Sequence, residues 1–151
     1  SQQTNMQNQH SIEILLADDD AEDRMLITDA LKESRLKNNI QCVENGEELL
    51  DFLNNRNKYS DKSKFPLPGI ILLDLNMPRK DGREALREIK ADNRLRHIPI
   101  IILTTSKAEE DILKTYNIGV NSFITKPVSF NSMVETMKTL NKYWFEIVEL
   151  P

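Results

Sequence analysis

Polar side chains that can do chemistry stand directly behind short apolar runs of the chain. Four runs end in this way, with 12–17 before Asp18, Asp19 and Asp20, 70–73 before Asp74, 98–103 before Thr104 and 122–125 before Lys126. The carboxyl ends of parallel strands meet at one edge of a sheet, where open α/β proteins bind ligands. If the runs are such strands, these carboxylates, the hydroxyl and the amine converge on one rim.

Three of these side chains, Asp18, Asp19 and Asp74, would then lie within a few ångströms of one another. Like charges at such distances repel and raise a carboxyl pKa unless a cation intervenes. A hard divalent ion takes oxygen ligands of this kind, and Mg²⁺ uses one or two carboxylates together with water and phosphate oxygens. The pattern therefore predicts a site for Mg²⁺ or Mn²⁺.

The same rim suits an incoming phosphoryl group. A cation and the ammonium of Lys126 would neutralise the phosphoryl oxygens, and Thr104 offers a hydroxyl donor. Asp74 could attack in line and form an aspartyl phosphate. Asp20, the last of the three acids, is better explained as the residue that caps the next helix.

The elements that must position these residues follow from hydrophobic periodicity. Strands are expected at 12–17, 40–43, 70–73, 98–103 and 122–125, and the third and fourth show almost no polar alternation, which is typical of strands buried on both faces. Amphipathic helical segments lie between them. The sequence predicts an α/β fold, a flavodoxin-like (βα)5 doubly wound parallel sheet in the order 2-1-3-4-5.

Local signals indicate where several helices begin. Asp20 precedes a helix whose apolar positions include Met25, and Ser106 with Glu109 matches a capping box. Gly82, after Asp81, is expected to start its helix through an unusual φ angle. The polar stretch 54–68 is expected to be an extended loop. Residues 1–11 are predicted to be a flexible tail, and 12–151 a single domain with an extended C-terminal helix and tail.

Composition narrows the function classes. The 151 residues carry a net charge of −4, which argues against a nucleic-acid binder. No apolar run approaches the ~20 residues that span a bilayer, and no secretory signal is visible, so we expect a cytoplasmic protein without membrane contact. The single cysteine, Cys42, excludes an intramolecular disulfide and is expected to be a small core residue.

At this point the residues resemble the response-regulator receiver domain of two-component systems over about residues 12–140. The motifs that carry the resemblance are Asp18-Asp19, Asp74 with Asn76-Met77-Pro78, Asp81-Gly82, Thr104 and Lys126-Pro127. The resemblance implies phosphorylation of Asp74 by a partner histidine kinase. It also implies Mg²⁺ on Asp18, Asp19, Asp74 and the backbone carbonyl of Asn76, a switch at Thr104 and Phe123, phosphoryl binding by Lys126, and a cis peptide at Pro127.

A narrower resemblance is to the cyanobacterial phytochrome response regulators. It rests on the tail 143–151, the long loop before the third strand, and 80–84. It implies a phytochrome kinase as the phosphodonor and a homodimer. The neighbouring aromatics Tyr143, Trp144 and Phe145 cannot all face one core and favour such an interface, which Tyr116 and Phe123 could join.

Three other functions remain open at this stage. An Asp-nucleophile phosphohydrolase usually has a second acid two residues after the first, where this chain has Asn76. A flavin-binding protein would need a Ser/Thr/Gly-rich loop after the first strand, where this chain has three aspartates. A receiver-like interaction module that is never phosphorylated is the third. In the preferred interpretation the chain is a phosphoacceptor that resets by hydrolysis, and not an enzyme in the ordinary sense.

Overall fold

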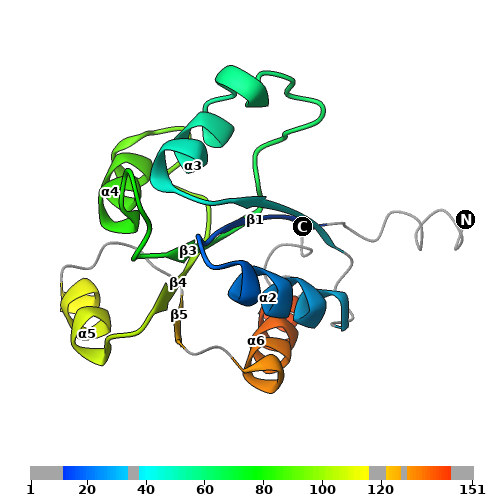
Figure 1. Ribbon diagram of the computed structural model, residues 1–151, viewed down its shortest axis with the longest axis vertical. Coiled ribbons are helices and arrows are strands. Elements are labelled where there is room, and N and C mark those ends of the chain that lie inside the picture. The colour runs from blue at the N-terminus through cyan, green and yellow to red at the C-terminus, as the bar shows by residue number, and fades with distance from the viewer. Residues whose placement is uncertain (1–11, 34–37, 116–121, 127–128, 144–151) are drawn as a thin grey trace, which may run out of the picture.

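The computed structural model describes residues 12–33, 38–115, 122–126 and 129–143 (Figure 1). Five parallel strands form one sheet in the order β2-β1-β3-β4-β5, which confirms the predicted flavodoxin-like topology. The strands are β1 (Ile12–Ala17), β2 (Asn38–Val43), β3 (Ile70–Asp74), β4 (Ile100–Thr104) and β5 (Ser122–Thr125). The helices are α2 (Ala21–Glu33), α3 (Gly46–Leu53), α4 (Gly82–Ala91), α5 (Lys107–Thr115) and α6 (Phe130–Tyr143), with a short 3-10 turn at Asn57–Tyr59.

The register between β1 and β3 determines which residues meet at the edge of the sheet. β1 pairs with β3 so that Ala17 stands opposite Leu73. The residues that follow, Asp18 and Asp74, therefore end two adjacent strands at the same edge. This is the point where the strand order reverses, because β1 also pairs with β2 on its other side.

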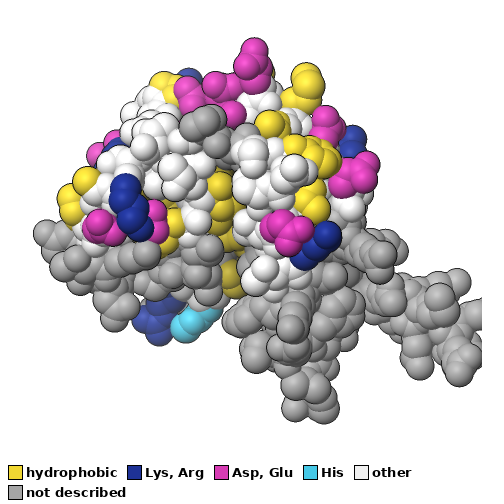
Figure 2. Space-filling model, turned by 90° about the horizontal axis from the view of Figure 1, so that it is seen from below, with side chains coloured by type: hydrophobic (Ala, Val, Ile, Leu, Met, Phe, Trp, Pro, Cys, Tyr) yellow, Lys and Arg dark blue, Asp and Glu magenta, His cyan; other side chains and the backbone are white. Residues whose placement is uncertain are grey.

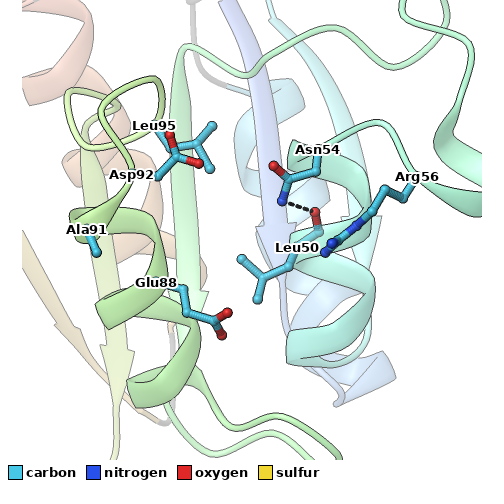
Figure 3. A pocket seen from close by; sticks show the side chains of 7 residues that line it. All are labelled: Leu50, Asn54, Arg56, Glu88, Ala91, Asp92 and Leu95. Atoms are coloured by element: carbon cyan, nitrogen blue, oxygen red, sulfur yellow. Dashed lines mark hydrogen bonds between the residues drawn. The ribbon is translucent and has the colours of Figure 1, made fainter.

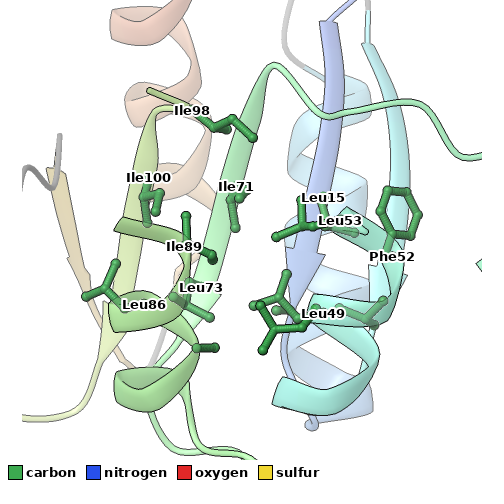
Figure 4. Packing of buried hydrophobic residues seen from close by; sticks show 14 of the residues in the cluster. Leu15, Leu49, Phe52, Leu53, Ile71, Leu73, Leu86, Ile89, Ile98 and Ile100 are labelled. Carbon is green, nitrogen blue, oxygen red and sulfur yellow. The ribbon is translucent and has the colours of Figure 1, made fainter. Parts of the chain in front are cut away.

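Two hydrophobic clusters cover the two faces of the sheet. The larger one joins the sheet to α3 and α4, and Figure 4 shows Leu49 and Leu53 of α3 and Leu86 of α4 directed toward the strands. The smaller one includes residues of α2 and Met133 of α6. Residues of β3 and β4 are all buried, which agrees with their unbroken apolar sequence.

Helix capping agrees with the sequence in part. Asp20 Oδ1 accepts hydrogen bonds from the backbone N–H of Glu22 and Asp23 at 2.9 and 3.1 Å, as a cap does. Ser106 Oγ accepts from Glu109 N at 3.1 Å. The other half of the predicted capping box is absent, because Ser106 N donates to Thr104 instead and the Glu109 carboxylate binds Arg83.

Gly82 is needed for space and not for its φ angle, which corrects the expectation. Asp81 caps α4 with its carboxylate and has ordinary extended backbone angles. A Cβ at position 82 would lie 2.3 Å from the carbonyl oxygen of Asp74 and 2.6 Å from Cα of Leu75. The first turn of α4 therefore packs directly against the backbone that carries Asp74.

The stretch 54–68 is more ordered than the predicted extended loop. Tyr59 and Phe65 pack edge to face with their ring centroids 5.1 Å apart, and both contact Phe52 of α3. Asn55 Nδ2 donates to the backbone oxygens of Tyr59 and Phe65 at 2.9 Å each. The aromatic side chains within this polar stretch thus extend the core.

Two apolar residues lie outside the core, and for Cys42 this corrects the expectation of a core residue. Met25 of α2 is 67% exposed. Cys42 is exposed as well, because β2 is the edge strand of the sheet.

Figure 2 views the molecule from below the orientation of Figure 1, and charged side chains of both signs lie scattered among hydrophobic ones on this face. Among the described helices, none has the length and apolarity required to span a membrane.

Candidate functional site

Three carboxylates meet at the edge of the sheet. Asp18 and Asp74 are buried, whereas Asp19 is exposed. One oxygen from each of Asp18, Asp19 and Asp74 lies within 4.8 Å of the other two. The convergence predicted from the strand ends is confirmed.

The two carboxylate oxygens of Asp18 differ in their hydrogen bonding. Its Oδ1 accepts a hydrogen bond from Asp20 N at 2.9 Å. Its Oδ2 is buried and accepts no hydrogen bond, although Lys126 Nζ lies 3.0 Å away. Burial raises the pKa of Asp18, against the lowering effects of the Asp20 N–H and of Lys126. A buried oxygen with an unused lone pair is available to a cation.

Asp74 lies between a backbone donor and an ammonium. Its Oδ1 accepts from Asn76 N at 3.0 Å, and its Oδ2 lies 3.2 Å from Lys126 Nζ. Burial raises the pKa of Asp74 to about 6, and the nearby charge of Asp18 adds to the rise, while the Asn76 N–H and Lys126 oppose it. An additional positive charge would favour the ionised form of this carboxyl.

Lys126 contacts three carboxylates. Its Nζ lies 2.8 Å from Asp23 Oδ2, 3.0 Å from Asp18 Oδ2 and 3.2 Å from Asp74 Oδ2. Burial lowers the pKa of Lys126, but its close contacts with the carboxylates of Asp23 and Asp18 outweigh this, so the pKa is raised overall and the ammonium stays charged. Asp23 had no predicted role. Its position in the first turn of a helix that begins at the rim was the available signal.

Thr104 ends β4 beside this group. It is buried, its Oγ1 accepts from Ser106 N at 3.1 Å, and its carbonyl accepts from Lys126 N at 2.8 Å. Phe123 of β5 is half-buried and packs against the larger core cluster. The structure places both residues on neighbouring strands, as the sequence predicted, and their switch role stays a prediction.

Arg83 is the second residue that the sequence did not single out. Its guanidinium donates to Leu75 O at 3.2 Å and to Asn76 Oδ1 at 3.3 Å, and it forms an ion pair with Glu109 of α5. It therefore connects the loop after Asp74 to the helix that follows Thr104.

The donor set fits a divalent cation. Three carboxylates share the site with one ammonium, so negative charge is in excess, and an oxygen of Asp18 lacks a hydrogen-bond donor. Hard oxygen ligands at this spacing suit Mg²⁺ or Mn²⁺. The residues that would hold the ion are Asp18, Asp19 and Asp74. The Asn76 backbone carbonyl remains a predicted fourth ligand.

Several predicted residues lie outside the described part of the chain. These are Tyr116, Pro127, Trp144 and Phe145. Tyr143 is the last described residue of α6, and its side chain is outside the description. The dimer face and the cis peptide stay predictions.

A separate hollow lies between α3 and α4. It has a volume of about 380 Å³, and Figure 3 shows Leu50, Asn54 and Arg56 on one side and Glu88 and Asp92 on the other. The charges are largely balanced, since Arg56 pairs with Asp51 and Glu88 with Lys80. None of the clustered carboxylates Asp18, Asp19 and Asp74 lines it, so the hollow is separate from the acidic site.

Comparisons with known proteins agree with this geometry. The response regulator receiver domain family matches residues 14–138. Response regulator Rcp1 of Synechocystis sp. is 36% identical over 138 residues, which cover 91% of this chain and 92% of Rcp1.

The solved structures that are similar to this fold include two of phytochrome-related response regulators. The phosphorylated cyanobacterial phytochrome response regulator RcpA gives a TM-score of 0.76 at 36% identity and covers 90% of this chain and 95% of its own. The Mn(2+)-bound form of Rcp1 gives 0.75 at 36% identity, covering 93% and 99%. Given the family match, the strand order and the acidic site, this chain belongs to the response regulator receiver domain family.

Proposed function

We propose that this chain accepts a phosphoryl group on Asp74 from a phosphohistidine of a sensor histidine kinase, in a Mg²⁺-dependent phosphorelay, and signals through a change of its surface. The observation that carries the proposal is the placement of Asp74. It is buried, lies beside two more carboxylates, and contacts the ammonium of Lys126. Within the family this arrangement belongs to a phosphoacceptor and not to a turnover enzyme.

The transfer uses residues of this chain in defined ways. A carboxylate oxygen of Asp74 attacks phosphorus, the P–N bond of the phosphohistidine breaks, and the imidazole leaves with the electron pair. Asn76 N holds Oδ1 of Asp74 in place. Lys126 exchanges part of its carboxylate contacts for a phosphoryl oxygen, so that its charge stabilises the added negative charge.

The cation would be held by Asp18, Asp19, Asp74 and the Asn76 carbonyl. When bound, it supplies positive charge that neutralises phosphoryl oxygens and keeps Asp74 ionised. The carboxylate of Asp19 is exposed and would contact the ion on its solvent side. The carboxylate of Asp18 is buried and would contact the ion on its inner side.

The switch would begin at Thr104. Its hydroxyl now accepts from Ser106 N, and in the proposal it turns toward a phosphoryl oxygen. Phe123, which is only half-buried, would follow by changing its rotamer. The added phosphoryl group thereby shifts a two-state equilibrium of the surface around α5 and α6.

The partner we propose is a phytochrome histidine kinase. Support comes from the similarity to Rcp1 and to the phytochrome response regulator RcpA over about nine-tenths of the chain. Because that donor draws its phosphoryl group from ATP, the proposal places the protein in the cytoplasm. It also treats residues 12–151 as one receiver domain and residues 1–11 as a tail.

The proposal includes a homodimer in which Tyr143, Trp144 and Phe145 take part, with Tyr116 and Phe123 at the same surface. Three adjacent aromatic residues favour an interface. Light scattering over a range of concentrations measures the dimer directly. A dimer that Trp144→Ala leaves equally stable would exclude the aromatic tail as its interface.

The phosphohydrolase alternative is disfavoured at position 76. Asn76 donates its backbone N–H to Asp74, and its side-chain oxygen accepts a hydrogen bond from Arg83. An amide has no acidic proton to deliver. A module that is never phosphorylated would keep the same fold, so an experiment must separate it from a phosphoacceptor.

The decisive experiment uses beryllofluoride, a phosphoryl analogue, with Mg²⁺. Wild type is expected to bind it and Asp74→Asn is not, as followed by NMR or isothermal titration calorimetry. Incubation with acetyl phosphate and Mg²⁺ is expected to add one phosphoryl mass to wild type alone. An equal response of both proteins would reject the proposal, and incubation with candidate kinases and ATP then identifies the donor.

A further inference from the structure

Arg83 donates hydrogen bonds to three separate parts of the molecule. Its Nη1 reaches Leu75 O at 3.2 Å and the carboxylate of Asp81 at 3.1 Å, and its Nη2 reaches Asn76 Oδ1 at 3.3 Å. Its Nε and Nη2 also bind the two carboxylate oxygens of Glu109. The side chain is 32% exposed, so these contacts are partly shielded from water.

Glu109 is connected to Thr104 beside the acidic site through hydrogen bonds of Ser106. Glu109 lies in the first turn of α5, and its backbone N donates to Ser106 Oγ at 3.1 Å. Ser106 N in turn donates to Thr104 Oγ1 at 3.1 Å. Hydrogen bonds therefore run from the Thr104 hydroxyl through α5 to Arg83, and from Arg83 to Asn76.

We propose that the ion pair of Arg83 with Glu109 holds α5 in the arrangement of the unphosphorylated site and thereby opposes phosphorylation of Asp74. This inference rests on the proposed function, in which the Thr104 hydroxyl turns toward the phosphoryl group. That turn removes the acceptor of Ser106 N, and Ser106 also caps α5. The first turn of α5, which includes Glu109, must then shift.

Arg83 itself cannot follow this shift freely. Leu75 O, Asn76 Oδ1 and the Asp81 carboxylate hold its guanidinium on the α4 side. The ion pair is consequently stronger in the unphosphorylated arrangement. By linkage, a contact made mainly in one state lowers the affinity for any ligand that favours the other state.

The ion pair also forms part of the surface. Arg83 and Glu109 line a groove of about 540 Å³ between α4 and α5, together with Leu86, Arg87, Lys90, Ile112 and Leu113. Ile112 is 54% exposed in this groove. Loss of the ion pair changes one wall of the groove. In this proposal, phosphorylation of Asp74 therefore alters the surface of the protein at this groove.

The first test measures beryllofluoride affinity in the presence of Mg²⁺. Glu109→Gln keeps the shape of the side chain and removes the charge, and it is expected to bind the analogue about fivefold more tightly than wild type, within the range of ordinary allosteric couplings. Glu135→Gln is the matched control, because it removes a carboxylate from an exposed ion pair with Lys138 on α6. Its affinity is expected to equal that of wild type.

The second test is a double-mutant cycle of Arg83→Gln and Glu109→Gln in urea unfolding, with and without Mg²⁺ and beryllofluoride. The coupling between the two residues is expected without the analogue and is expected to shrink with it. A merely structural pair would keep the same coupling in both conditions, and that result, or an unchanged affinity of Glu109→Gln, overturns the inference. If wild type itself fails to bind the analogue, the proposed function fails as well.

Discussion

Lys126 Nζ lies 2.8 Å from Asp23 Oδ2, nearer than it lies to Asp18 or Asp74. Asp23 comes from α2 and not from a strand end, and its side chain is 23% exposed. In the proposed function, Asp23 would therefore compete with the incoming phosphoryl group for the same ammonium, and its negative charge would repel that group.

Asp23→Asn is accordingly expected to strengthen the binding of beryllofluoride. The gain should be about two- to fivefold, because a partly exposed ion pair contributes up to about 1 kcal/mol. Titration of the analogue at constant Mg²⁺ measures it. Asp29→Asn removes the same charge from an exposed position of the same helix and should leave the affinity unchanged. Weaker binding in Asp23→Asn would mean that Asp23 orients Lys126 and does not compete for it.

The raised pKa of Asp74 predicts a pH-dependent effect on stability. Its folded value of about 6 exceeds the ordinary 3.8, so the folded state takes up the proton more readily than the unfolded state. The charged carboxylate therefore destabilises the fold above about pH 6, and this penalty fades as the pH falls from 6 toward 4.

Asp74→Asn is expected to raise the free energy of unfolding by about 1–3 kcal/mol near pH 8 and by much less near pH 4.5. Urea denaturation without divalent metal at the two pH values checks both size and sign. Asp29→Asn again serves as the control, with little change at either pH. A larger gain at low pH than at high pH would contradict the sign.

Gly82→Ala separates local helix propensity from packing. Alanine favours a helix over glycine, so propensity alone predicts a stabler protein. The added Cβ would instead meet the backbone of Asp74 and Leu75 at 2.3 and 2.6 Å. Because backbone atoms cannot move aside as a flexible side chain can, we expect a loss of about 1–3 kcal/mol and weaker Mg²⁺ binding. A stabilised protein with unchanged Mg²⁺ affinity would show that the backbone yields without cost.

The sheet order and the acidic cluster could be predicted because both depend on strands. An unbroken apolar run such as 70–73 indicates a buried strand, and the next residue, Asp74, then has a known position at the sheet edge. Asp18 and Lys126 are placed by the same rule. No knowledge of side-chain conformation was needed.

Asp23 and Arg83 could not be placed in this way. Each lies in the first turn of a helix, and its contacts depend on how far a long or rotatable side chain reaches across to another element. Cys42 was misjudged for a related reason, because an apolar run does not reveal that its strand lies at the sheet edge. Helical periodicity likewise did not show that Met25 faces solvent.

The aromatic cluster of the stretch 54–68 could not be predicted from composition, because most residues of this stretch are polar. Phe65 packs against Phe52 and Tyr59 at centroid distances of 5.6 and 5.1 Å. The cluster belongs to the α3 end of the larger core and includes none of the clustered carboxylates. Its contribution to stability should therefore be separable from the chemistry of the site.

Phe65→Ala is expected to lower the free energy of unfolding by about 2–3 kcal/mol, less than for a fully buried phenylalanine because Phe65 is only half-buried. Its affinity for Mg²⁺ and beryllofluoride should stay within about twofold of wild type, since distant sites with no shared contacts act independently. Leu67→Ala, at a side chain that is 43% exposed, is the control and should cost little. Urea unfolding measures the change in stability, and titration of beryllofluoride on the same samples measures the affinity. A Phe65→Ala protein as stable as wild type would show that the stretch does not stabilise the core, and a large loss of analogue affinity would show that it supports the acidic site.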